Sequence, residues 1–187
     1  MADTDKQDVV DLLLQQHSHI RQLFASVDGA VHNPTRQQRF EELRRFLAVH
    51  ETAEELITHP AARTTDGGND VVDARLEEET ESKKMLAELD GMSVDEAGFK
   101  AKFQELKTAV LAHAKAEEQE EFTLLRKDKD AAQLERMASA VLAAEAIAPT
   151  HPHPSVGSSM TTNLMAGPLA SVIDRTRDAV RAALEKG

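Results

Sequence analysis

The chain contains no cysteine, no tryptophan and no tyrosine among its 187 residues. Without cysteine it can form no disulfide, iron–sulfur cluster or thiolate zinc site, a composition that fits a reducing compartment. Without tyrosine it can form no tyrosyl radical. No apolar run approaches the roughly 20 residues that span a bilayer, and residues 1–6 lack the basic start and apolar stretch of a signal peptide. These absences predict a cytoplasmic protein with no membrane partner.

Positive charge is also scarce, because 33 acidic residues face 22 lysines and arginines and the formal net charge is −11. A surface this acidic repels phosphate backbones, so no nucleic-acid partner is expected. The length corresponds to one domain with room for a modest appendage, and it is sufficient for a hydrophobic core.

Helical periodicity dominates the sequence, and alternating strand patterns are missing. Four helices are predicted, from about Asp5 to Val27, Arg36 to Ala62, Asp70 to Leu89, and Ser93 to Lys127. Ser93 is the expected N-cap of the last helix, with Glu96 completing a capping box. Four helices of similar length with short connections predict an all-α, up-down-up-down four-helix bundle over residues 1–129.

Residues 130–187 form a predicted C-terminal helical extension that packs on the bundle. An alanine-rich helix is expected from Ala131 to Ile147, followed by a linker rich in proline and serine. Pro168 then fits the first turn of a last amphipathic helix.

The main chemical motif occurs twice. The second predicted helix contains His50 and Glu54 and the fourth contains His113 and Glu117, each pair in the pattern His-x-x-x-Glu-Glu. Residues four apart lie on one face of a helix, about one turn from each other, so an imidazole and a carboxylate placed this way can reach the same metal ion.

These polar residues interrupt apolar stripes that should face the core. His50 and Glu54 follow Leu43 in steps of three and four, and His17 keeps the same phase as its apolar neighbours in the first helix. In the third helix, counting along the buried phase places Glu79 inward. A buried carboxylate without a partner costs several kcal/mol, so the pattern predicts that positive ions lie between the helices.

The segments Gln16 to Phe24, His50 to Pro60 and His113 to Phe122 resemble the cation-binding motifs of the hemerythrin-like family, in the same order over roughly residues 8–126. The resemblance implies a four-helix bundle that holds two iron ions, bridged by two motif carboxylates and an oxo or hydroxo group. By the same resemblance, the motif positions fall on His17, His50, Glu54, His113 and Glu117.

The third helix departs from the family pattern, which commonly has a histidine there. This chain has Glu77-Glu78-Glu79-Thr80-Glu81 instead, so the sixth ligand is Glu79, Glu78 or neither. His59 is interpreted as a histidine favoured by the C-terminal dipole of its helix, with metal binding as the alternative.

With this ligand set, roughly two of about 12 coordination positions on two octahedral ions remain open. Open positions and oxygen donors favour reaction with a small oxidant over reversible oxygen binding. The leading hypothesis is therefore disproportionation of hydrogen peroxide, in the manner of a catalase. A module that binds or senses oxygen or nitric oxide without turnover is the alternative. No motif indicates a redox partner.

Overall fold

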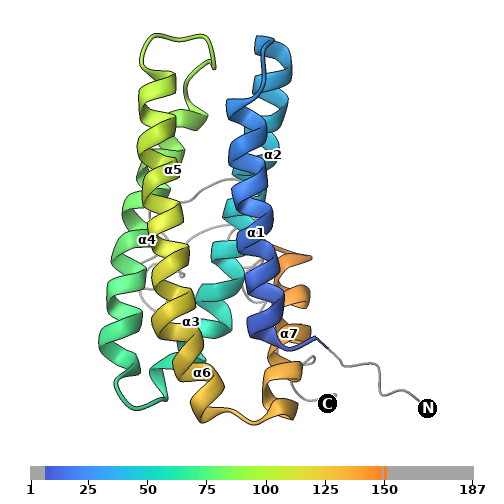
Figure 1. Ribbon diagram of the computed structural model, residues 1–187, viewed down its shortest axis with the longest axis vertical. Helices are drawn as coiled ribbons and strands as arrows, with labels where there is room; N and C mark the ends of the chain where they lie inside the picture. The colour runs from blue at the N-terminus through green and yellow to red at the C-terminus, as the bar shows by residue number, and fades with distance from the viewer. Residues whose placement is uncertain (1–6, 149, 151–187) are drawn as a thin grey trace, which may run out of the picture.

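The computed structural model describes residues 7–148 and residue 150. Within this part of the chain every regular element is helical, and Figure 1 shows a helical bundle, so the all-α fold class is confirmed. The elements are α1 (Val9–Asp28), α2 (Asn33–Leu56), α3 (Thr58–Arg63), α4 (Gly68–Asp90), α5 (Phe99–Ala116), the π-helical turn η1 (Glu117–Glu121), α6 (Phe122–Asp128) and α7 (Ala131–Glu145). The predicted linker from residue 151 and the last predicted helix lie outside the described residues.

The bundle consists of two helical hairpins that lie side by side (Figure 1). In the first hairpin α1 packs along α2, and in the second α4 packs along α5. Asp8 caps α1 by accepting a hydrogen bond from the backbone N–H of Asp11 at 2.8 Å. Pro34 occupies the first turn of α2, where its missing N–H costs nothing.

The sequence pattern predicts one continuous second helix, but the structure shows a break in it. It ends at Leu56, and the short α3 begins at Thr58. A proline ring clashes with the carbonyl four residues earlier in a regular helix, and Pro60 stands four residues after Leu56. The break turns the backbone just before His59, which becomes important for the site.

The fourth predicted helix also differs from the expectation at two places. It begins at Phe99, and Ser93 is not its N-cap; the cap is Gly98, at φ 98°, a left-handed conformation that glycine adopts without strain. Ser93 and Glu96 form a local turn instead. The helix then widens into η1, and π-helical turns occur frequently at functional sites.

Two apolar clusters fill the interior, one toward each end of the bundle. One contains Phe24, Phe40, Leu43, Phe103 and Leu106, and the other contains Leu13, Ala53, Phe122 and Leu125. Helix α7 packs against α1 and α2 and adds Leu134, Met137 and Val141 to the second cluster. Among the described residues, no helix is both long and apolar enough to cross a membrane.

Candidate metal centre

The six predicted ligands converge in the interior, between the two apolar clusters. Each hairpin supplies three of them, and none of the six residues is more than 7% exposed. They are His17 on α1, His50 and Glu54 on α2, Glu79 on α4, His113 on α5 and Glu117 on η1. Their ligand atoms form two groups, each within 4.8 Å: His17, His50 and Glu54, and Glu54, Glu79, His113 and Glu117. Glu54 belongs to both groups, so its carboxylate lies where two cations could share it.

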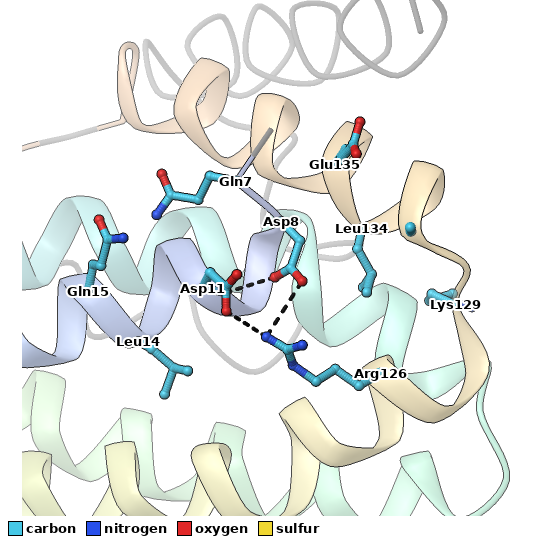
Figure 2. A pocket seen from close by; sticks show the side chains of 10 residues that line it. Gln7, Asp8, Asp11, Leu14, Gln15, Arg126, Lys129, Leu134 and Glu135 are labelled. Carbon is cyan, nitrogen blue, oxygen red and sulfur yellow. Dashed lines mark hydrogen bonds and ion pairs between the residues drawn. The ribbon is translucent and has the colours of Figure 1, made fainter. Parts of the chain in front are cut away.

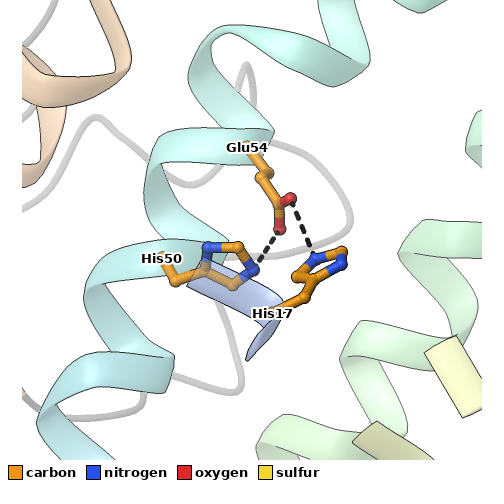
Figure 3. A group of neighbouring side chains, drawn as sticks. All are labelled: His17, His50 and Glu54. Atoms are coloured by element: carbon orange, nitrogen blue, oxygen red, sulfur yellow. Dashed lines mark ion pairs between the residues drawn. The ribbon is translucent and has the colours of Figure 1, made fainter. Parts of the chain in front are cut away.

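In the first group, two imidazole rings face the two oxygens of one carboxylate (Figure 3). His50 Nε2 lies 3.3 Å from Glu54 Oε2, and His17 Nε2 lies 3.9 Å from Glu54 Oε1. A similar arrangement surrounds Glu117, which lies between one histidine of each group. His113 Nε2 lies 3.3 Å from Glu117 Oε1, and His17 Nε2 lies 3.3 Å from Glu117 Oε2.

The atoms that face this space have no hydrogen-bond partner among the described residues. They are the Nε2 atoms of His17 and His113 and both carboxylate oxygens of Glu54 and Glu117, all buried. An unsatisfied buried carboxylate is costly, and buried charges in proteins are paired or bind metals. The donor set of imidazole nitrogens and carboxylate oxygens therefore fits a pair of first-row transition-metal ions.

In the metal-free protein, the pKa values of the two central carboxyl groups, Glu54 and Glu117, shift in opposite directions. Burial raises the pKa of Glu54 well above its usual value, and the nearby Glu117 raises it further. Burial acts on Glu117 in the same direction, but His113 and His17 hold its pKa well below the usual range. Burial also lowers the pKa of His50 to about 3, so its ring is neutral at pH 7 and offers a lone pair, the state that binds metal.

Two of the histidines are oriented through Nδ1, which bonds to a carboxylate that an arginine also contacts. His17 Nδ1 donates to Glu118 Oε1 at 3.0 Å, and Glu118 accepts from Arg21 at 2.6 Å. His113 Nδ1 donates to Glu78 Oε2 at 3.0 Å, and Glu78 accepts from Arg75 at 2.8 Å. A hydrogen bond at Nδ1 fixes the tautomer and turns Nε2 toward the interior, as in metal sites generally. Glu78, the alternative third-helix ligand, therefore lies behind His113, outside both groups.

The third histidine is oriented by an amide from α1 and by the end of α7. His50 Nδ1 donates to Gln16 Oε1 at 2.7 Å, and Gln16 Nε2 donates to Glu145 Oε1 at 2.6 Å. Because Glu145 accepts only from the amide nitrogen, it determines which end of Gln16 faces His50. The C-terminal extension thus contributes to the site.

Glu79 differs from the other two carboxylates because both of its oxygens already accept hydrogen bonds. Oε1 accepts from His59 Nε2 at 2.6 Å, and Oε2 accepts from Lys83 Nζ at 3.0 Å. Burial favours the neutral acid, but His59 and Lys83 hold the pKa of Glu79 below its usual range. Lys83 also contacts Glu55 and lies 3.9 Å from Glu51. To bind a metal ion, Glu79 must exchange one of these bonds for the ion.

His59 and Glu121 are buried functional candidates beyond the six predicted ligands; the sequence left metal binding by His59 open as an alternative, and Glu121 was not predicted. The interpretation of His59 as a helix C-terminal residue is wrong, since it is the second residue of α3 and only 2% exposed. Its Nδ1 donates to Glu121 Oε1 at 2.9 Å. Glu121 could have been found in the sequence, because it continues the four-residue spacing of His113 and Glu117.

Aromatic rings cover two of the histidines. Phe122 stacks on His17 with ring centroids 5.5 Å apart and an angle of 21° between the planes. Phe46 stacks on His50 at 6.2 Å and 18°. These rings help to keep water away from the ligand nitrogens, which strengthens electrostatic interactions inside the site.

A separate surface pocket lies between the start of α1 and the connection from α6 to α7 (Figure 2). Three of its charged lining residues pair with one another: Arg126 Nη2 lies 2.6 Å from Asp11 Oδ1 and 3.5 Å from Asp8 Oδ2. None of the six predicted ligands lines this pocket.

Comparison with known proteins identifies relatives of the chain. An uncharacterized hemerythrin-like protein of Schizosaccharomyces pombe is 24% identical over 91% of this chain and 85% of its own length. A protein of Nostoc sp. named DNA nickase is 26% identical over 76% of this chain, which covers only 41% of the Nostoc protein. The crystal structure of a hemerythrin HHE cation-binding domain-containing protein from Mycobacterium kansasii superposes with a TM-score of 0.67 at 20% identity, covering 95% of this chain and 99% of that one.

The sequence model of the hemerythrin HHE cation-binding domain matches residues 8–125, the segment that carries all six predicted ligands. This match covers most of the chain and includes both hairpins. The chain therefore belongs to the hemerythrin HHE cation-binding domain family.

Proposed function

We propose that this chain is a non-haem di-iron protein that disproportionates hydrogen peroxide. The observation that carries the proposal is the set of buried Nε2 atoms and carboxylate oxygens that face one another around Glu54 and Glu117 without a hydrogen-bond partner among the described residues. Two iron ions linked by an oxo or hydroxo bridge would supply the open coordination positions and the reversible two-electron change that the reaction requires.

The ligand roles follow from the geometry. His17, His50 and His113 would bind through Nε2, since each Nδ1 is already used in a hydrogen bond. Glu54 and Glu117 would each bridge the two ions, because both oxygens of each carboxylate lack a hydrogen-bond partner among the described residues and each carboxylate lies near two histidines. Glu79 would be a terminal ligand. Three histidines with three carboxylates form an oxygen-rich set that favours the ferric state.

The reaction also needs a place to hold protons. In disproportionation one peroxide is oxidised to oxygen and loses two protons, while the other takes two protons and becomes two molecules of water. Glu79 Oε1 and His59 Nε2 lie 2.6 Å apart and can hold one proton between them. Lys83 would release the other oxygen of Glu79 when that oxygen binds the ion.

Burial of the site restricts what can reach it. The predicted ligands are at most 7% exposed, and aromatic rings lie against two of the histidines. Such a site suits molecules of two to four atoms, which include peroxide, oxygen and nitric oxide. The same enclosure supports a second candidate function, binding or sensing of oxygen or nitric oxide without turnover.

The test is oxygen evolution from peroxide by the iron-loaded chain, recorded with an oxygen electrode. Glu54→Gln should abolish the activity while circular dichroism remains helical, because the amide keeps the volume but cannot bridge two cations. Glu42→Gln, on an exposed position of the same helix, is the matched control and should retain activity. Reversible oxygen binding with no peroxide turnover would select the second candidate and refute the first.

The activity named for the Nostoc protein belongs to a chain of which this one spans about two fifths. A net charge of −11 opposes binding to a DNA backbone, so we do not extend a nicking activity to this chain. Nicking of a supercoiled plasmid by the iron-loaded chain would contradict this.

A further inference from the structure

His59 and Glu121 form, with Glu117, a third group of ligand atoms within 4.8 Å of one another. His59 is 2% exposed and Glu121 is fully buried. Neither residue is a ligand in the proposed two-ion centre. The group combines one imidazole with two carboxylates, a donor set that suits divalent first-row transition metals.

The third group is continuous with the other two. Glu54 is shared by the first and second groups, and Glu117 is shared by the second and third. Both oxygens of Glu117 are buried and have no hydrogen-bond partner among the described residues. Each carboxylate oxygen carries two lone pairs, so Glu117 can bind a cation in the third position as well as the ions of the proposed centre. The four-residue spacing of His113, Glu117 and Glu121, carried through the π-helical turn, sets these side chains on one face of the helix.

The existing contacts already gather buried carboxyl groups at this position. A single imidazole ring links two of them, with Nδ1 bonded to Glu121 and Nε2 bonded to Glu79. Lys83 also contacts Glu79, whereas Glu121 pairs with His59 alone among the described residues, and a buried carboxylate favours a nearby cation. The break of the helix at Ile57 and the wide turn η1 bring His59 and Glu121 together at this point.

We propose that His59, Glu117 and Glu121 hold a third divalent metal ion beside the two-ion centre. This inference rests on the proposed centre, because Glu117 is common to both. The ion would link His59 and Glu121, the two side chains that a 2.9 Å hydrogen bond connects in the metal-free protein. Three protein ligands leave a coordination position open for water.

The experiment counts zinc ions bound to the full chain. The metal-free protein is loaded with Zn²⁺, dialysed, and analysed by plasma emission spectroscopy; zinc is chosen because it has no redox chemistry. The wild-type chain should hold three zinc ions and Glu121→Gln two. Glu120→Gln is the matched control, since it makes the same change on an exposed residue of the same turn, and it should hold three. Circular dichroism verifies that each variant is folded.

The outcomes separate this inference from the proposed function. Two zinc ions in the wild type and two in Glu121→Gln overturn the third position and leave the two-ion centre intact. Three zinc ions in the wild type and three in Glu121→Gln place the extra ion elsewhere, which also overturns the third position. No bound zinc in the wild type refutes the third position together with the centre. Anomalous scattering from zinc-loaded crystals should show the third ion within bonding distance of Glu121.

Discussion

Replacement of Glu54 by glutamine should stabilise the metal-free protein and at the same time prevent metal binding. Glu54 is fully buried, and burial together with Glu117 raises its pKa well above the usual value of 4.5. Without metal, the fold must therefore keep this carboxyl group protonated at a pH where the unfolded chain releases the proton. An amide of the same shape removes that requirement, and its N–H groups can serve the unpaired oxygens of Glu117.

The size of the effect follows from proton linkage. A group with a raised pKa in the folded state lowers stability as the pH rises above its unfolded value. Above the usual value of 4.5 the loss is about 1.4 kcal/mol per pH unit for as long as the folded protein keeps the proton. For a chain of this length, each 1 kcal/mol gained in Glu54→Gln raises the melting temperature by roughly 2–4 °C. At pH 5 the difference should fall below about 1 kcal/mol.

Urea unfolding of the metal-free wild type and of Glu54→Gln, monitored by circular dichroism at pH 5 and pH 7, measures the difference in their free energies of unfolding. With zinc present the order should reverse, because the metal stabilises only the protein that binds it, by about 2.7 kcal/mol at a free concentration one hundred times Kd. The reasoning is refuted if metal-free Glu54→Gln is less stable than the wild type at pH 7, or if its gain is equal at both pH values.

Two further predictions concern the residues around the ligands. Glu118→Gln and Glu78→Gln should each weaken zinc binding about 10–100-fold without loss of helix, because Glu118 and Glu78 orient the rings of His17 and His113. Competition with a coloured chelator measures the affinity for zinc. Unchanged affinity would argue against the orienting role. Lys83→Met should destabilise the metal-free protein by about 3–5 kcal/mol in urea, since it leaves buried carboxylates without their cation. The exposed neighbour Lys84→Met should change stability by less than about 0.5 kcal/mol, and equal effects at the two positions would contradict the argument.

The bundle and its central residues could be predicted because both depend on local periodicity. His50 and Glu54, like His113 and Glu117, stand in phase with apolar neighbours, and a buried phase places a side chain in the interior whatever the surrounding fold. The structure brings all six predicted side chains together there. Counting along α4 favoured Glu79 over Glu78, and of these two only Glu79 belongs to a group of ligand atoms.

The positions of His59 and Glu121 depend on two departures from that periodicity, the short helix α3 and the π-helical turn η1. The phase of the second predicted helix could not be extended to His59, because the chain changes direction at Ile57 before Pro60. Contacts between distant segments were equally inaccessible. Nothing near Gln16 in the sequence indicates that Glu145, 129 residues later, fixes the orientation of its amide.

The division of the bundle into two hairpins has a mechanical consequence. The pair α1 and α2 carries His17, His50 and Glu54, while the other hairpin carries Glu79, His113 and Glu117. An ion bound by side chains from both halves would cross-link them, much as a disulfide does in a secreted protein, in a chain that has no cysteine. A chelator would then act as a reductant does on a disulfide, and amide hydrogens along the seam between the hairpins would exchange faster once the metal is removed.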